Sequence, residues 1–444
     1  MTRMKRLGAL FWAATALAVV GATRVEAQNA SANVTLTAIV PYTQLDADYF
    51  ELQDMYRQFH AQNPNITIKF DAMAHDAYHT KMQALAISGN LPNLLSLWPG
   101  KRTGYLTDRG YARDLSPWVK RDDLAATQRA VFLQPQGRDG QIYELGVPYV
   151  LYTSIVYANK ALLDKLGLTF PKTLKEFEAQ APIIEKAGYH PVVYGDQSSW
   201  ILQSCLLSTL VGRIGGPEWF QHARFGTNGA SFRDAPFVKA LQTVKDMVDT
   251  GLIDRSEPST MREQALSEFV SGRSVYFIGG VWEVENLDSS LPAAMKSQIL
   301  MKPFPHIDGE AFTDDASTSG EIATGFGISK SSTEQQAEAA WKWIKFSMNV
   351  ANADNFLKHG ILPIYKTGGD LSPRIHDPLL RTSYNFSAGI NTVLPVLDDK
   401  MDAEGVVQII DAGLQELVLG SITPQQLADQ YETWVAAHDS NRKH

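Results

Sequence analysis

The chain alternates between short apolar runs rich in β-branched residues and longer amphipathic stretches, and this alternation constrains its fold most. Residues 35–40 (TLTAIV) predict a strand, and the apolar stripe over 48–62 predicts a helix. Alternating apolar residues over 66–70 and the run 94–98 (LLSLW) predict two further strands. Strands that alternate with helices are typical of βαβ units, so we expect a largely parallel sheet covered by helices.

The same alternation starts again after residue 150. Thr173 and Glu176 have the spacing of a helix-capping box, an apolar helical stripe follows over 237–248, and residues 274–278 (SVYFI) predict a strand. No repeat, low-complexity tract or long flexible linker separates the two halves. The sequence therefore predicts an α/β protein of two lobes, each a sheet flanked by helices, joined by hinge crossings near 148–153, 300–306 and 349–358.

Both predicted lobes are discontinuous in sequence. We expect the N-terminal lobe to contain residues 28–149 plus 306–350, and the C-terminal lobe to contain residues 150–304 plus 355–440.

Two later helices are predicted from their residue patterns. Trp341 lies on an apolar helix stripe, which indicates a core residue. Near the end, Thr423 and Gln426 have the spacing that begins a final helix.

The first 27 residues have the three parts of a secretory signal peptide. A basic start is followed by an apolar run over 7–20, and Val25-Glu26-Ala27 is a small-residue cleavage site. The apolar run is too short to span a bilayer, although an uncleaved anchor is the alternative. No cysteine follows the run, so we expect a periplasmic protein that is released at Gln28 and not lipid-anchored.

Cysteine content and charge exclude several classes of protein. The single Cys205 cannot form a disulfide within the chain, but a mature chain of this length can bury large cores without one. Removal of the signal takes away four basic residues and one acidic residue, which changes the net charge from −8 to −11. Such a charge disfavours binding to nucleic acid, because phosphate contacts need a basic surface.

Aromatic and polar residues follow several predicted strands, where ligands of open α/β sheets bind. Tyr42 and Gln44 follow the first strand, while Trp98, Lys101 and Arg102 end or follow the third. Elsewhere, Trp282 follows the strand over 274–278, and Trp200 stands at a predicted helix start. Aromatic faces can stack on the C–H face of a sugar ring, and nearby polar groups can bind its hydroxyls. The alternative is that these tryptophans are core residues, and that Lys101 and Arg102 are solvated.

These residues lie in a chain that resembles the extracellular solute-binding proteins of family 1, the maltose-binding-like proteins that serve ABC sugar importers. The resemblance extends over nearly the whole mature chain and implies two α/β lobes that close on a ligand between them. Asn93 stands where this family commonly has Asp, and Ala158 where it commonly has an aromatic residue, which leaves the choice of substrate open. The segments that carry the resemblance are 81–100, 147–177, 272–286 and 325–346.

The resemblance also implies positions for ligand contacts. It adds Tyr152, in the first crossing, to the residues that follow the strands, and Glu283 stands next to Trp282. The complete expected ligand-binding set is Tyr42, Gln44, Trp98, Lys101, Arg102, Tyr152, Trp200, Trp282 and Glu283.

The hypotheses of an enzyme and of a metal-binding protein have weaker support in the sequence. The sequence lacks G-x-S-x-G, H-E-x-x-H and G-x-x-x-x-G-K-[ST] motifs. Glu283 and Glu285 could be a glycosidase pair, but residues so close together are expected to point in different directions. His75 and His79 could bind a metal on one helical turn, but Asp76 is expected to cap that helix and leave His75 outside it. We therefore expect no catalytic residue, no metal and no cofactor.

The leading hypothesis is a periplasmic binding protein, a monomer, that delivers a sugar or oligosaccharide to an ABC transporter permease. A polyol, an acidic sugar or another small solute is the first alternative, because Lys101 and Arg102 could pair with a carboxylate. A secreted carbohydrate-active enzyme is an alternative of a different class. The closed form could also signal to a membrane receptor.

Overall fold

The computed structural model describes residues 33–44, 47–97, 103–128, 130–133, 140–147, 149–322, 325–358, 362–363 and 371–438. The expected signal peptide, residues 1–27, lies outside these ranges, as do Trp98, Lys101 and Arg102. Within the described ranges, no helix combines the length and the apolar character needed to cross a membrane.

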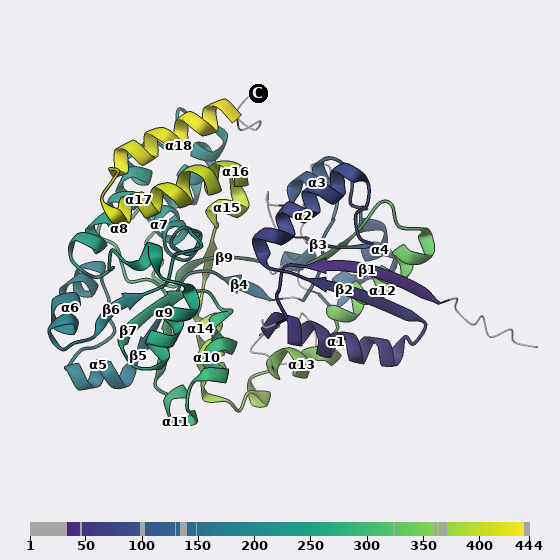
Figure 1. Ribbon diagram of the computed structural model, residues 1–444, viewed down its shortest axis with the longest axis horizontal. Coiled ribbons are helices and arrows are strands. Elements are labelled where there is room, and N and C mark those ends of the chain that lie inside the picture. Colours follow the sequence, from purple (N-terminus) through teal and green to yellow (C-terminus); the bar gives the residue numbers. More distant parts are fainter. Residues whose placement is uncertain are drawn as a thin grey trace, which may run out of the picture.

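The chain forms two lobes that lie side by side, each built on a sheet flanked by helices (Figure 1). In the N-terminal lobe the strand order is β10-β3-β1-β2. Its strands are β1 (Val34–Val40), β2 (Ile66–Ala72), β3 (Leu94–Leu97) and β10 (Gly325–Ile328), and its helices include α1 (Ala47–Gln62), α2 (His75–Ser88), α3 (Gly104–Asp108), α4 (Ser116–Arg121), α12 (Glu334–Ser347) and α13 (Ala353–Lys358). The predicted strand over 35–40 and helix over 48–62 are thus confirmed as β1 and α1. The second helix, α2, begins at His75, so Asp76 is not its cap.

Strand β1 lies at the centre of the N-terminal sheet, parallel to β2 and to β3, whereas β10 is antiparallel to β3. Because side chains alternate along a strand, Leu36 and its even-numbered neighbours join a core with α1 and α12, while Ile39 packs on the opposite face with α2. Trp341 of α12 is fully buried in the first of these cores, which confirms it as a core residue.

The C-terminal lobe has the strand order β6-β7-β5-β8. Its elements are β5 (Ile155–Asn159), α5 (Lys160–Leu166), α6 (Leu174–Lys186), β6 (His190–Val193), α7 (Ser208–Phe225), α8 (Ala235–Asp249), α9 (Arg262–Val270), β7 (Ser274–Gly279), α10 (Glu283–Ser290), α11 (Ala293–Lys296), β8 (Ile299–Lys302), α14 (Pro378–Gly389), α15 (Leu397–Lys400), α16 (Ala403–Gly405), α17 (Ala412–Leu419) and α18 (Pro424–His438). Strand β5 is antiparallel to both of its neighbours, so the expected parallel arrangement holds only for β6 and β7.

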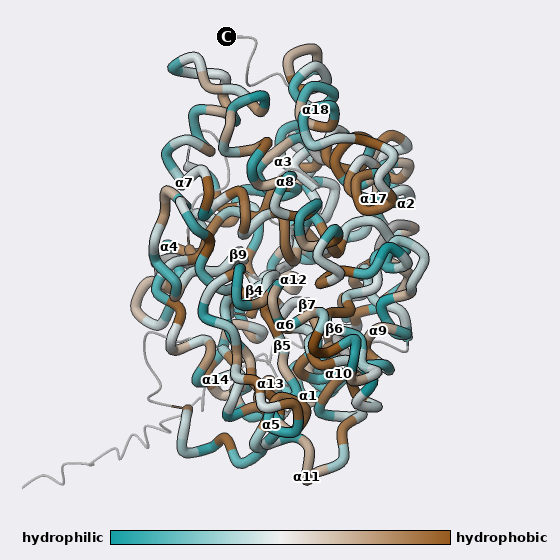
Figure 2. Tube along the Cα trace, turned by 90° about the vertical axis from the view of Figure 1, so that its left-hand side faces the viewer, coloured by the Kyte–Doolittle hydropathy of each residue, from teal (hydrophilic) through white to brown (hydrophobic). Residues whose placement is uncertain are grey.

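Helices α7, α8, α17 and α18 enclose the largest core of the C-terminal lobe. Figure 2 shows α17 as a strongly hydrophobic segment, and its Leu414, Leu417 and Val418 are buried. Thr423 accepts a hydrogen bond from the Gln426 amide, and the Gln426 side chain accepts one from the Thr423 amide. This reciprocal cap confirms the predicted start of α18.

A small three-stranded sheet joins the lobes. It has the order β11-β9-β4 and contains β4 (Val150–Tyr152), β9 (Ser317–Ile322) and β11 (Thr392–Leu394). Figure 1 shows β4 and β9 running between the two lobes. The Ser319 hydroxyl lies 2.8 Å from those of Thr153 and Thr209. A Cβ on Gly320 would lie 2.8 Å from the Leu151 carbonyl oxygen, so only glycine allows β9 and β4 to approach this closely.

The second passage between the lobes comes later than the expected 300–306. Arg213 of α7, which is fully buried, donates to the Phe304 carbonyl at 2.7 Å. It also contacts the carboxylates of Glu310 and Asp315, each at 2.9 Å. These contacts hold residues 304–315 on the C-terminal lobe, so the chain passes back along β9 into β10.

Candidate functional site

Trp282 stands at the end of a tight turn after β7. A Cβ on Gly280 would lie 2.2 Å from the Trp282 ring, so the indole lies directly on the glycine backbone. The Tyr157 hydroxyl, on β5, donates to the Gly280 carbonyl at 2.7 Å and so holds the turn in place. The sequence Gly279-Gly280-Val281-Trp282 thus holds a large, half-buried aromatic ring in one place.

Glu283, the first residue of α10, is only 1% exposed. Its carboxylate accepts hydrogen bonds from Trp282 Nε1 at 2.9 Å, from Arg262 Nη1 at 3.2 Å and from Asn286 Nδ2 at 3.1 Å. The expectation that Glu283 contacts the ligand does not fit this burial, because both oxygens are occupied by protein donors.

Trp200 lies beside Trp282, with the ring centroids 5.7 Å apart and the planes tilted by 51°. Both rings are half-buried and pack against the core of the C-terminal lobe. The structure therefore brings these two predicted residues together into one aromatic surface, which we call the tryptophan pair.

A buried acidic loop positions Trp200. The Glu257 carboxylate accepts from the amides of Tyr194 and Gly195 at 2.9 and 2.6 Å, and Asp196 accepts from the Leu202 amide at 3.1 Å. Burial raises the pKa of both Asp196 and Glu257 to about 7. Their hydrogen bonds to the backbone set the path of the chain into the helical segment that follows Trp200.

The tryptophan pair lies next to the sheet that joins the lobes. The Val281 amide, one residue before Trp282, donates to the Tyr152 carbonyl on β4 at 2.8 Å. Tyr152 itself is only 5% exposed, and its ring packs edge-on against that of Phe386, with the ring centroids 5.5 Å apart. Burial raises the pKa of the Tyr152 hydroxyl to about 12. Tyr152 therefore supports the site from within the core, where a ligand contact was expected.

On the N-terminal lobe, Tyr42 is half-buried and Gln44 is exposed, both in the loop after β1. Tyr42 lies near Tyr78, whose hydroxyl donates to the Ser96 carbonyl at the end of β3. Burial, followed by the neighbouring Tyr105, Glu144 and Tyr42, holds the pKa of Tyr78 well above its usual value. We call Tyr42, Tyr78 and Tyr105 the tyrosine cluster. It lies at the carboxyl ends of β1 and β3.

Three buried carboxyl groups meet where the lobes join. Glu144, just before β4, accepts from the Gly325 amide at 2.7 Å. Burial raises the pKa of Glu144 to about 8, and Asp399 of α15 adds to this effect. Burial and then Asp399 also hold the pKa of Glu321 on β9 well above its usual value. No local sequence signal identifies this group, because its members are far apart in the chain.

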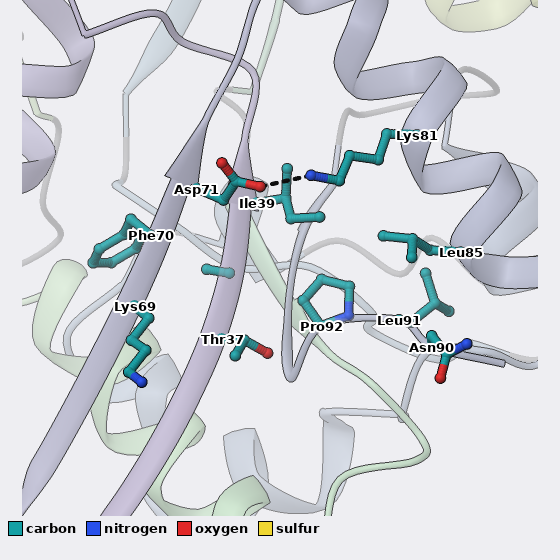
Figure 3. Close-up of a pocket in the computed structure, with 11 residues that line it drawn as sticks. Thr37, Ile39, Lys69, Phe70, Asp71, Lys81, Leu85, Asn90, Leu91 and Pro92 are labelled. Atoms are coloured by element: carbon teal, nitrogen blue, oxygen red, sulfur yellow. Dashed lines mark hydrogen bonds and ion pairs between the residues drawn. The ribbon is translucent and has the colours of Figure 1, made fainter. Parts of the chain in front are cut away.

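A separate pocket of about 360 Å³ lies on the face of the N-terminal sheet that carries α2. Figure 3 shows Lys81 of α2 pointing towards Asp71 of β2, and the two side chains are 2.6 Å apart. None of the residues described above for the site lines this pocket.

One cluster in the described part of the chain has metal-ligand spacing. Side-chain ligand atoms of His306, Glu310 and Asp315 lie within 4.8 Å of one another. Arg213 binds both carboxylates, and His306 Nδ1 lies 2.6 Å from the Glu310 carboxylate. The guanidinium already supplies the positive charge, so the cluster is an ion-pair network that anchors residues 304–315.

Comparison with known proteins identifies the family. The family described as bacterial extracellular solute-binding protein matches residues 54–378. The chain belongs to this family. The match confirms the resemblance drawn from the sequence, and the fold is the two-lobe fold of periplasmic solute-binding proteins.

Individual relatives of this solute-binding protein are distant. A putative binding protein of Brucella abortus is 24% identical over 349 residues, which cover 77% of this chain and 78% of the relative. The maltodextrin-binding protein MdxE of Bacillus subtilis is 24% identical over 318 residues, 69% of this chain and 68% of the relative. A solved chitin oligosaccharide binding protein matches with a TM-score of 0.80 at 21% identity, over 93% of this chain and all of that one. All three are binding proteins by name.

Proposed function

We propose that this protein is the periplasmic substrate-binding component of an ABC importer. It captures a sugar or oligosaccharide in a cleft between its lobes and catalyses no reaction on it. The observation that carries the proposal is the tryptophan pair, Trp200 and Trp282, held beside the joining sheet with rings 5.7 Å apart. Half-buried aromatic rings with a few fixed polar groups are characteristic of small-ligand sites.

The chemistry of the tryptophan pair suits a carbohydrate. The indole donor of Trp282 is already bonded to Glu283, so the exposed part of the ring offers apolar surface. Such a surface matches the C–H face of a sugar ring, and Arg262, 26% exposed, stands beside it as a donor for hydroxyls. Relatives named for maltodextrin and chitin oligosaccharide support the same class of ligand.

The joining sheet supports a mechanism of lobe closure. A ligand that touches the tryptophan pair and the half-buried Tyr42 of the N-terminal lobe makes both sets of contacts only when the lobes are closed. A ligand shifts a conformational equilibrium only through such differential contacts. The mature monomer, released from its signal peptide at residues 1–27, would present the closed form to the permease.

A thermal-shift screen tests the proposal. The mature protein is mixed with maltotriose, chitotriose, xylotriose and raffinose, and each sugar is recovered and analysed by chromatography. A ligand at a hundred times its Kd stabilises the folded state by about 2.7 kcal/mol, so a binder raises the melting temperature by several degrees. We expect at least one sugar to do so and to be recovered unchanged. Stabilisation by none of a wide panel, or conversion of the sugar to product, contradicts the proposal.

A further inference from the structure

We infer that Glu283 is a positioning residue. Its buried carboxylate fixes the Trp282 indole and the Arg262 guanidinium as one rigid wall, and it acts on the ligand only through them. The inference rests on the proposed function, because it assigns a role within the proposed sugar site.

The hydrogen bonds described above for the Glu283 carboxylate are all made with other side chains of the protein. One carboxylate oxygen accepts from both Trp282 and Arg262, at 2.9 and 3.2 Å, and the other accepts from Asn286 at 3.1 Å. A buried carboxylate is tolerated only when its charge is paired and its oxygens are hydrogen-bonded. Arg262 supplies the pairing charge, and the two other donors complete the hydrogen bonding.

The bond to Trp282 fixes the orientation of the indole. The ring has a single donor, so the bond from Nε1 to Glu283 selects one rotation of the ring about its bond to Cβ. Gly280 supports the ring from one side, as a Cβ at that position would lie 2.2 Å away. A ring fixed before the ligand arrives loses less freedom on binding, which favours affinity.

The same carboxylate neutralises Arg262. The Arg262 side chain is 26% exposed, and its guanidinium also lies 3.5 Å from the exposed carboxylate of Glu263. With Glu283 charged, the pair carries no net charge, so this wall favours the hydroxyls of a neutral sugar. Removal of the Glu283 charge leaves the exposed carboxylate of Glu263, at 3.5 Å, beside Arg262, so the wall becomes more positive and repels an acidic sugar less.

Glu283→Gln, Glu283→Ala, Trp282→Ala and the double variant Trp282→Ala/Glu283→Ala test the inference. Glu263→Gln is the matched control, because it removes an equal charge next to Arg262 but does not contact Trp282. Three readouts are used: Kd for the neutral sugar that stabilises the wild type, Kd for digalacturonate, and the exchange rate of the Trp282 indole N–H by NMR without ligand. The Trp282→Ala spectrum assigns that signal, and melting temperatures show whether each variant folds.

We expect Glu283→Ala and Trp282→Ala each to weaken sugar binding about ten- to hundredfold, and the double variant to be no weaker than the poorer single variant. Glu283→Ala should also speed exchange of the indole N–H. Glu283→Gln keeps the volume and one acceptor, so it should retain slower exchange while its preference shifts towards digalacturonate over the neutral sugar. Glu263→Gln should resemble the wild type in its Kd for the neutral sugar and in its rate of indole exchange.

Two results would overturn the inference: a Glu283→Ala protein with wild-type exchange and wild-type Kd, or losses that add in the double variant. The exchange measurement needs no ligand. It therefore separates failure of the inference from failure of the proposed function, in which no sugar binds the wild type but the indole N–H is still held by Glu283.

Discussion

Glu144 makes the protein less stable as the pH rises, and replacing it with Gln should remove that dependence. The carboxyl is buried at the junction of the lobes, and burial raises its pKa to about 8 from a usual value of 4.5. Between these two values the unfolded chain loses the Glu144 proton while the folded protein keeps it. Unfolding then releases a proton, so the free energy of unfolding falls as the pH rises through this window.

The size of the effect follows from the width of the window. Each pH unit between 4.5 and 8 lowers the free energy of unfolding by about 1.4 kcal/mol, so the full contribution is about 5 kcal/mol. Glu144→Gln keeps an oxygen that accepts from the Gly325 amide but carries no titrating group. The variant should therefore match the wild type near pH 4.5 and exceed it by several kcal/mol at pH 8.

Urea unfolding followed by circular dichroism at pH 5, 6, 7 and 8 measures this difference. Glu416→Gln, at an exposed position of α17, is the control and should track the wild type throughout. The wild type and Glu144→Gln both keep a downward slope from Asp196 and Glu257, whose pKa values burial raises to about 7, so the difference between the two proteins isolates Glu144. A constant gap between Glu144→Gln and the wild type from pH 5 to pH 8 would refute the reasoning.

Three further predictions concern single side chains. Trp282→Ala should weaken sugar binding by about 1–3 kcal/mol by calorimetry. Trp434→Ala, at another half-buried tryptophan, should leave sugar binding unchanged. A loss of affinity equal to that of Trp282→Ala would contradict a role for the tryptophan pair. Gly280→Ala, whose Cβ would lie 2.2 Å from the Trp282 ring, should displace the indole and weaken binding, whereas Gly389→Ala, with open space around it, should not. Arg213→Met should cost about 3–5 kcal/mol of stability in urea unfolding, because it removes the guanidinium that pairs with the buried Glu310 carboxylate and leaves only His306 beside it. A loss as small as that of Arg233→Met, whose ion pair is half-exposed, would contradict this.

Features that depend on neighbours in sequence were predictable. Thr173 accepts from the Glu176 amide at 3.2 Å, although the Glu176 carboxylate bonds the Lys172 amide and not Thr173. Gly251 follows α8 with a positive φ of 77°, as expected of a glycine after a helix. Periodicity and capping are local, so the sequence contains most of them, although α2 begins at His75 and Asp76 is not its cap.

Features that depend on distant contacts were not predictable. The later return to the N-terminal lobe depends on Arg213, a charged residue that the helical pattern gives no reason to bury. Strand β5 is antiparallel to β7 because it leaves the joining sheet and β7 returns to it, an arrangement that apolar runs do not encode. Similarly, the sequence marked Glu283 as polar and next to Trp282, but only the structure shows which way its carboxylate points.

Small-angle X-ray scattering with and without the sugar identified by the thermal-shift screen tests the central claim most directly. If the ligand binds between the lobes and closes them about the joining sheet, the radius of gyration at saturation should be smaller than that of the free protein. Trp282→Ala should need about ten- to hundredfold more sugar than the wild type to reach the same smaller radius. A wild-type radius that does not change at saturation would contradict binding with lobe closure.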